Sequence, residues 1–126
     1  MAKDEGYIKL FRSLLTWEWI DKPETLSTFI FLLLVANHSD NEWHGTTIKR
    51  GQTVTSYTEI AHKMGLSVQQ VRTSIKRLKS TGEITHQKTN RYSLITISNY
   101  EVYQSVVNTP INNQATVSQQ SSNNQS

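Results

Sequence analysis

The stretch that most constrains the fold spans residues 56–79 and reads SYTEIAHKMGLSVQQVRTSIKRLK. Glu59 and Gln70 each follow a serine by three positions, which is the spacing of a capping box at the start of a helix. Gly65 falls between the two predicted helices, where a left-handed residue ends a helix without steric cost. Two short helices joined by a glycine-containing turn indicate a helix-turn-helix.

The second of these helices has an apolar face and a basic face. Its apolar residues recur at spacings of three and four, which predicts one stripe against a core: Val68, Val71, Ile75 and Leu78. No Asp or Glu occurs in residues 68–82, although a solvated helix face usually mixes both signs. One interpretation is a basic surface helix without a partner. We favour a recognition helix, whose Gln, Thr and Arg side chains reach base edges and whose Lys side chains bind phosphates.

The net charge of +3 is unevenly distributed along the chain. Residues 1–42 carry a net charge of −3 and residues 43–104 carry +6, whereas residues 105–126 contain no charged side chain. The positive charge therefore lies in the part that holds the helix-turn-helix, as binding to a polyanion requires.

Several functional classes are disfavoured by composition. The chain has no cysteine, which excludes disulfides and thiolate metal sites and is typical of a cytoplasmic protein. We expect no signal peptide, and the apolar run at residues 29–36 is far shorter than the roughly 20 residues that cross a bilayer, so no membrane partner is expected. The four histidines lack metal-ligand spacing and the glycines are isolated. We therefore expect no enzymatic activity, no cofactor and no metal.

Two further helices are predicted before the helix-turn-helix. Residues 7–20 carry two apolar stripes, so this helix must lie between other elements or contribute to a dimer contact. Pro23 suits the first position of a second helix, where its missing N–H is not needed. That helix, residues 24–37, is apolar nearly all round and should be the central helix. Self-association through these N-terminal helices is one expectation.

Short strands are predicted on both sides of the helix-turn-helix. Residues 38–45 are expected to form a polar turn, with Trp43 folding back onto the core, and Arg50-Gly51 to turn a short strand or hairpin. After the recognition helix, residues 83–88 and 91–98 are β-rich and are separated by Thr89-Asn90, where Asn tolerates the left-handed conformation of a tight hairpin.

A helix-turn-helix followed at once by a β-hairpin is a winged helix. The predicted fold class is α+β, a winged helix-turn-helix with extra N-terminal helices and a small antiparallel β-sheet. Residues 99–104 should close this domain by docking Tyr100 and Tyr103. The domain is predicted to span residues 1–104, and the Ser-, Asn- and Gln-rich residues 105–126 to form a disordered tail or linker.

The expected partner is double-stranded DNA, bound by polar and basic side chains of the recognition helix, the wing and the turn before the first cap. These predicted DNA-binding residues are Ser67, Gln69, Gln70, Arg72, Thr73, Lys76, Arg77, Lys79, Lys88, Asn90, Arg91, Lys49 and Arg50. Within this set, Gln69, Thr73 and Arg77, with Gln70 beside them, are predicted to reach base edges, and Lys76 and Lys79 to bind phosphates.

The chain resembles the N-terminal winged-helix domain of DnaD-like replication proteins encoded by phages and prophages of low-GC Gram-positive bacteria. The resemblance covers residues 6–104 and is carried by GYIKLFRSLLTWEWI, FIFLLLVANHSDNEWHG, IKRGQTVTS, GLSVQQVRTSIKRLKSTGEIT and TNRYSLITISNYEVYQ. It implies origin-DNA binding in replication initiation, coupled to primosome assembly or helicase loading. Two alternatives stay open: a winged helix for protein interaction or oligomerisation, and a transcriptional regulator.

Overall fold

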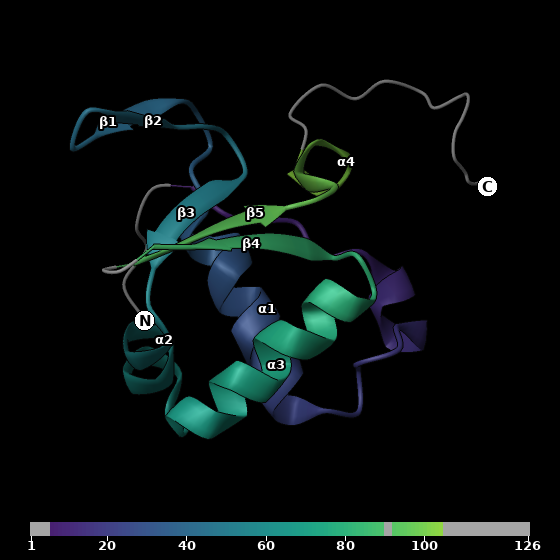
Figure 1. Cartoon of the computed structure of the whole chain (residues 1–126). Coiled ribbons are helices and arrows are strands. Elements are labelled where there is room, and N and C mark those ends of the chain that lie inside the picture. Colours follow the sequence, from purple (N-terminus) through teal and green to yellow (C-terminus); the bar gives the residue numbers. More distant parts are fainter. Residues whose placement is uncertain (1–5, 90–91, 105–126) are drawn as a thin grey trace.

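The computed structural model describes residues 6–89 and 92–104 (Figure 1). Its helices are the 3-10 helix η1 (Arg12–Thr16), α1 (Pro23–Val35), α2 (Tyr57–Met64), α3 (Val68–Ser80) and α4 (Tyr100–Gln104). Its strands are β1 (Asn41–Trp43), β2 (Thr46–Ile48), β3 (Gln52–Thr55), β4 (Ile84–Lys88) and β5 (Ser93–Ile97). The predictions for Asn90, Arg91, the side chain of Tyr103 and the tail at residues 105–126 lie outside the described residues.

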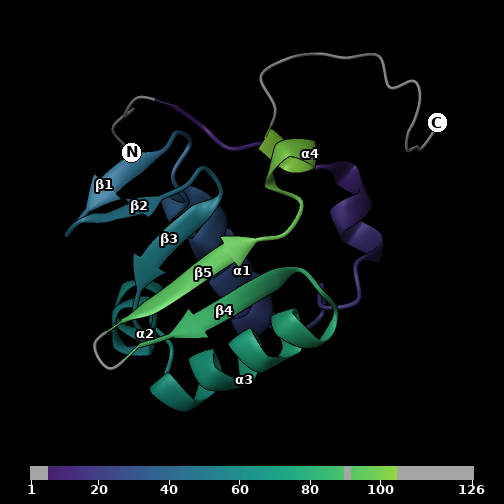
Figure 2. The same ribbon diagram turned by 45° about the horizontal axis from the view of Figure 1, so that its top comes forward.

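A three-stranded antiparallel sheet with the order β3-β5-β4 supports the helix-turn-helix (Figure 2). The β4–β5 hairpin is the predicted wing, and its register pairs Ile84 with Ile97 and Lys88 with Ser93. The first strand of the sheet comes before α2 and the other two follow α3, which is the arrangement of a winged helix. The predicted α+β fold class is confirmed.

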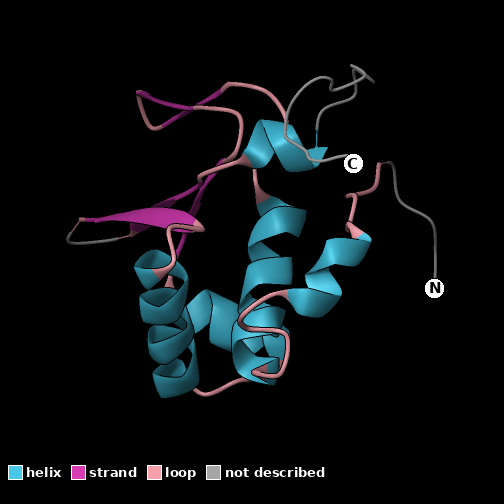
Figure 3. Ribbon diagram, turned by 90° about the vertical axis from the view of Figure 1, so that its right-hand side faces the viewer, coloured by secondary structure: helices cyan, strands magenta, loops and turns pink. Residues whose placement is uncertain are grey.

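Helix α1 occupies the centre, as predicted, and packs against α3. Pro23 stands at its start and Glu24 lies in its first turn, where a carboxylate favours the helix dipole. The apolar side chains with the least exposure come from α1, α2, α3 and the sheet: Leu32, Ile60, Val71, Ile75, Leu78, Ile84 and Ile95. Figure 3 shows the longer helices gathered on one side of the sheet, while the two-stranded hairpin lies on the other.

The helix-turn-helix forms where its capping signals predict. Ser56 Oγ accepts a hydrogen bond from the backbone N–H of Glu59 at 3.1 Å, and α2 ends at Gly65, which has φ +70°. The capping box predicted at the start of α2 is only half formed, because the Glu59 carboxylate accepts a hydrogen bond from Thr55 Oγ1 at 3.0 Å rather than from the Ser56 backbone N–H. The box at the start of α3 is complete.

The predicted helix over residues 7–20 is wrong, because this segment contains only η1. The Trp17 indole N–H donates to Glu83 Oε2 at 2.8 Å, and the Trp19 indole N–H donates to Thr81 Oγ1 at 3.1 Å. In a continuous helix, residues two positions apart point about 200° away from each other. A helix therefore cannot bring both rings onto the α3–β4 junction, whereas the irregular segment does.

Of the short strand or hairpin predicted around Arg50-Gly51, the strand is confirmed as β3, which leads into the Ser56 cap. The hairpin is wrong, because β2 pairs with β1 and β3 pairs with β5. The turn of the observed hairpin is His44-Gly45, where both residues have positive φ (49° and 78°), as a type I′ turn requires. Residues 38–45, expected to be a turn, thus include a strand. Gly51 directs the chain into the sheet instead, since its N–H donates to Asn37 O at 2.7 Å and its carbonyl accepts from Ile97 N at 2.9 Å.

Helix α4 closes the domain against the N-terminal segment. Tyr100 is buried, as predicted, and the Gln104 side-chain amide pairs with the backbone N–H and carbonyl of Lys9 at 2.8 and 2.9 Å. A Cβ atom on Gly51 would lie 2.9 Å from Tyr100 Cβ, so this close approach also requires glycine at position 51.

Candidate nucleic-acid interface

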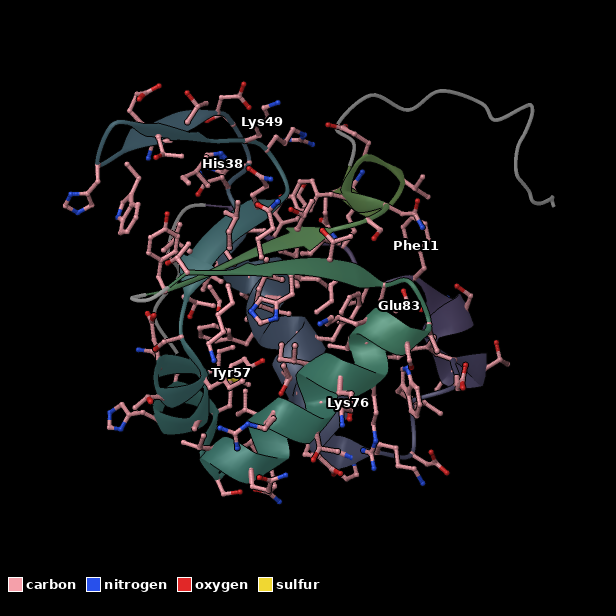
Figure 4. All side chains as sticks on the ribbon, viewed as in Figure 1. Phe11, His38, Lys49, Tyr57, Lys76 and Glu83 are labelled. Atoms are coloured by element: carbon pink, nitrogen blue, oxygen red, sulfur yellow. The ribbon has the colours of Figure 1, made fainter. Side chains whose placement is uncertain are left out.

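The outer face of α3 is basic and exposed, and Lys76 projects from it (Figure 4). Arg72, Lys76 and Lys79 are exposed, whereas Val71, Ile75 and Leu78 on the inner face are buried, as predicted. Val68 departs from the predicted stripe, because its side chain is 37% exposed. The helix therefore presents three cations and no carboxylate on the side away from the core.

A polar network orders the first two turns of this face. Arg72 Nη1 donates to Gln69 Oε1 at 3.1 Å, and Gln69 Nε2 donates to Thr73 Oγ1 at 3.5 Å. The Arg72 guanidinium also lies over the Tyr57 ring of α2, 5.6 Å from its centroid. Burial raises the pKa of Tyr57 above its ordinary value of 10, which favours the protonated hydroxyl.

A groove of about 230 Å³ separates the start of α3 from the wing. Its lining includes Tyr57, Val68, Arg72, Lys88 and Tyr92. Arg72 and Lys88 come from different elements and bring two positive charges to this one groove. Such a pair suits a phosphate, which arginine binds through its fork of donors and lysine as a point charge.

His86 of β4 lies beneath this surface, with its ring centroid 5.8 Å from that of Tyr57. Its Nε2 atom is buried and has no hydrogen-bond partner among the described residues. Burial, followed by the charges of Lys79 and Lys88, lowers the pKa of His86 below its ordinary value of 6.5. His86 is therefore neutral at pH 7, and its protonation opposes the native fold.

The free energy of unfolding should consequently decrease as the pH falls below about 6.5. The unfolded chain binds a proton at this residue more readily than the folded chain does, so acid favours unfolding in that range. Urea unfolding at pH 7 and pH 5.5 measures the loss. His86→Gln should show a smaller loss between these pH values than the wild type, and an equal loss in both proteins would contradict the assignment.

Arg77 has a different position from the predicted one. Its Nη1 donates to Glu24 Oε2 at 2.9 Å and to Thr25 Oγ1 at 3.0 Å, and its guanidinium lies 5.7 Å from the Trp19 ring centroid. The side chain is only 28% exposed. Arg77 thus joins α3 to α1, a position that differs from the outward one on which the prediction of base readout depends.

Arg50 and Lys49 are also displaced from the predicted surface. The Arg50 guanidinium donates to the Glu101 carboxylate and to the carbonyls of His38 and Gln104, and lies 5.0 Å from the Tyr100 ring centroid. Lys49 is exposed, but Figure 4 places it across the sheet from Lys76. Both residues therefore lie away from the α3 surface on which they were predicted, because the β1–β2 pairing carries this turn to the other side of the sheet.

Ser67 and Gln70 are exposed, but their side chains are used by the capping box. Ser67 Oγ accepts from Gln70 N at 3.0 Å, and Gln70 Oε1 accepts from Ser67 N at 2.9 Å. Both side chains therefore bond to the backbone at the start of α3. The predicted residues that share the α3 and wing surface are Gln69, Arg72, Thr73, Lys76, Lys79 and Lys88.

Three aromatic residues at this surface were not predicted: Tyr57, His86 and Tyr92. Their proximity depends on the packing of β4 and β5 against α2 and α3, and no local spacing in the sequence indicates it.

Within residues 6–89 and 92–104, no helix has the length and hydropathy needed to cross a membrane.

Comparison with known families agrees with this geometry. Residues 25–84 match a family model described as a helix-turn-helix domain, a range that holds most of α1, all of α2 and α3, and the first residue of β4. No curated protein and no solved structure matches the chain significantly. The match supports DNA as a partner. Residues 25–84 thus resemble a helix-turn-helix domain, and the three-stranded sheet around them gives the arrangement of a winged helix.

Proposed function

We propose that the protein binds duplex DNA, with α3 in the major groove and the wing against the neighbouring backbone. The observation that carries this proposal is the shared groove between Arg72 of α3 and Lys88 of the wing, on a helix face without carboxylates. One strand of DNA that follows this groove meets cations from both elements. Since phosphate contacts supply most of the affinity and position the protein, this surface is suited to the task.

The side chains of α3 divide into two roles under this proposal. Lys76 and Lys79 are single-point donors that bind phosphates, whereas Gln69 can offer an amide donor and acceptor to an adenine edge. Thr73 is half-buried and lies within hydrogen-bonding distance of Gln69, which limits the orientation of that amide.

A salt titration of binding to duplex DNA tests the proposal. If Arg72, Lys76, Lys79 and Lys88 each neutralise one phosphate, log K should fall with log salt at a slope of about −3 to −4. Fluorescence anisotropy with a labelled duplex measures this slope. A flat response, or no binding at low salt, would contradict DNA binding and favour a winged helix for protein interaction or oligomerisation.

We further propose that the DNA is a replication origin and that the protein acts in replication initiation. The resemblance over residues 6–104 supports this role, and primosome or helicase-loading proteins are the partners it implies. A transcriptional regulator fits the same fold equally well. Site selection with random duplexes, followed by mapping of the enriched motif on the source genome, separates the two. Motifs clustered at an origin support initiation, and motifs at promoters support regulation.

A specific observation also favours self-association. The N-terminal segment exposes large apolar side chains beside a pocket of about 290 Å³ that Leu14, Trp17, Phe29 and Leu33 help to line. The exposed fractions are 87% for Tyr7, 51% for Leu10, 48% for Phe11 and 76% for Leu15. Apolar surface of this kind is typical of a protein contact.

Sedimentation velocity at high micromolar concentration should therefore show a species larger than the monomer. Leu15→Asp should shift the protein to the monomer, because it places a charge in the apolar contact. Thr46→Asp, at an exposed residue of the β1–β2 hairpin that does not line this pocket, is the matched control and should leave the association intact. A strictly monomeric wild type would disprove self-association.

A further inference from the structure

An aromatic pair joins the β1–β2 hairpin to the wing. Trp43 lies at the closed end of this hairpin, and its ring meets that of Tyr92 edge to face, with centroids 4.8 Å apart and an interplanar angle of 78°. The side chain of Tyr92 lines the groove that also contains Arg72 and Lys88. Figures 1 and 2 show the closed end of the β1–β2 hairpin on the same side of the molecule as the outer end of the wing.

Tyr92 sits where the wing turns. Thr89 donates to the Tyr92 carbonyl through its backbone N–H at 2.9 Å and through its hydroxyl at 3.1 Å, and Tyr92 N donates back to Thr89 Oγ1 at 3.2 Å. The position of the Tyr92 ring is therefore coupled to the backbone that directly follows Lys88.

The outer end of the wing extends beyond the three-stranded part of the sheet. Strand β3 pairs with β5 only from Thr96 back to Ser93, so Tyr92 has no β3 neighbour. A hairpin of two strands alone is marginally stable in water. Contact with Trp43 begins at the residue where support from β3 ends.

The hairpin that carries Trp43 is itself anchored. The type I′ turn at His44-Gly45 sets the register that pairs Trp43 with Thr46. At the base of the hairpin, Ile48 is 4% exposed and its carbonyl accepts from Asn37 Nδ2 at 3.3 Å. Trp43 is thus presented to the wing from an element attached to the core.

We infer that Trp43 is a positioning residue for the wing. It holds Tyr92, and through Tyr92 the adjoining Lys88, at the distance from α3 at which both elements contact the same DNA. The inference rests on the proposed binding of duplex DNA and adds a residue outside the helix-turn-helix and the wing to the determinants of affinity. An aromatic pair of this geometry stabilises beyond the area that it buries, which suits it to restrain a strand end.

Binding measurements test the link to DNA. Trp43→Ala should reduce the salt slope by about 1 and weaken binding by about tenfold near 0.1 M salt, as loss of one phosphate contact does. Lys88→Ala should have the same effect, and the double variant should be no weaker than either single variant. Trp43→Phe keeps an edge-to-face partner and should restore binding, and Thr46→Ala, the exposed residue facing Trp43, serves as the control. Additive effects of Trp43→Ala and Lys88→Ala would overturn the inference.

Amide hydrogen exchange of the free protein tests, without DNA, whether the Trp43–Tyr92 contact restrains the wing. The Thr89 N–H should exchange faster in Trp43→Ala than in the wild type and return to the wild-type rate in Trp43→Phe, while the amides of α3 stay unchanged. Unchanged exchange at Thr89 in Trp43→Ala would overturn the inference. Absence of duplex binding by the wild type at low salt would instead overturn the proposed function, so the two failures are distinguishable.

Discussion

Replacing Lys76, Lys79 and Lys88 together by Ala should weaken binding to duplex DNA by about 10²–10³-fold near 0.1 M salt. Each ammonium that neutralises a phosphate releases condensed counterions, so the three substitutions should flatten the dependence of log K on log salt by about 3. Because all three side chains are exposed, their replacement should change the free energy of unfolding only slightly. Anisotropy titrations at four or more salt concentrations give both quantities.

The matched control removes the same number of charges from other places on the protein. Arg12, Lys22 and Lys49 lie outside α3 and the wing, so replacing these three by Ala should change the slope by less than about 1. Equal effects of the two triple variants would mean that binding responds to net charge rather than to the proposed surface.

Arg77→Ala should lower the free energy of unfolding by about 2 kcal/mol, because it leaves Glu24 and Thr25 without the guanidinium that bridges them. This figure is below that for a fully buried pair, since the side chains of Arg77 and Glu24 are 28% and 25% exposed. In a domain of this size the midpoint of thermal unfolding should fall by roughly 10 °C. Calorimetry or thermal circular dichroism measures the shift.

A double-mutant cycle identifies the cause of this loss. Glu24→Gln removes the charge at the other end of the pair, so Arg77→Ala should cost less in that background than in the wild type. The backbone hydrogen bond at Glu24, followed by Arg77, lowers the pKa of the Glu24 carboxyl below 4.5, so its contribution is present above that pH and is lost in stronger acid. The coupling in the mutant cycle and this pH dependence are both expected if the Arg77–Glu24 pair stabilises the packing of α1 against α3.

Site selection then separates the two roles considered for Arg77. At a temperature well below both unfolding midpoints, the wild type and Arg77→Ala should enrich the same DNA motif, because the guanidinium is bound to α1. Enrichment of a different motif by Arg77→Ala would restore the role in base readout that the sequence alone predicts.

The helix-turn-helix could be predicted from the sequence because its signals are local. The hydroxyl of Ser67 and the amide of Gln70 meet within one turn of helix, and Gly65 adopts its left-handed conformation at the end of α2. The buried stripe of α3 follows from helical periodicity alone, apart from Val68 at its exposed start. The central position of α1 follows from its apolar composition.

What the sequence by itself determined is therefore the winged helix-turn-helix, with its basic α3 and its wing, since caps, turns and apolar periodicity act over a few residues. Only the tertiary structure decided how the remaining side chains are used. Arg77 was predicted to face DNA and is bound to Glu24, and the predicted N-terminal helix gives way to the contacts of Trp17 and Trp19 with the α3–β4 junction. Trp43 reaches Tyr92 across a separation of 49 positions. Each of these outcomes depends on contacts between residues distant in sequence. Such contacts can override the local conformational preference of a segment, and they form only when the chain packs.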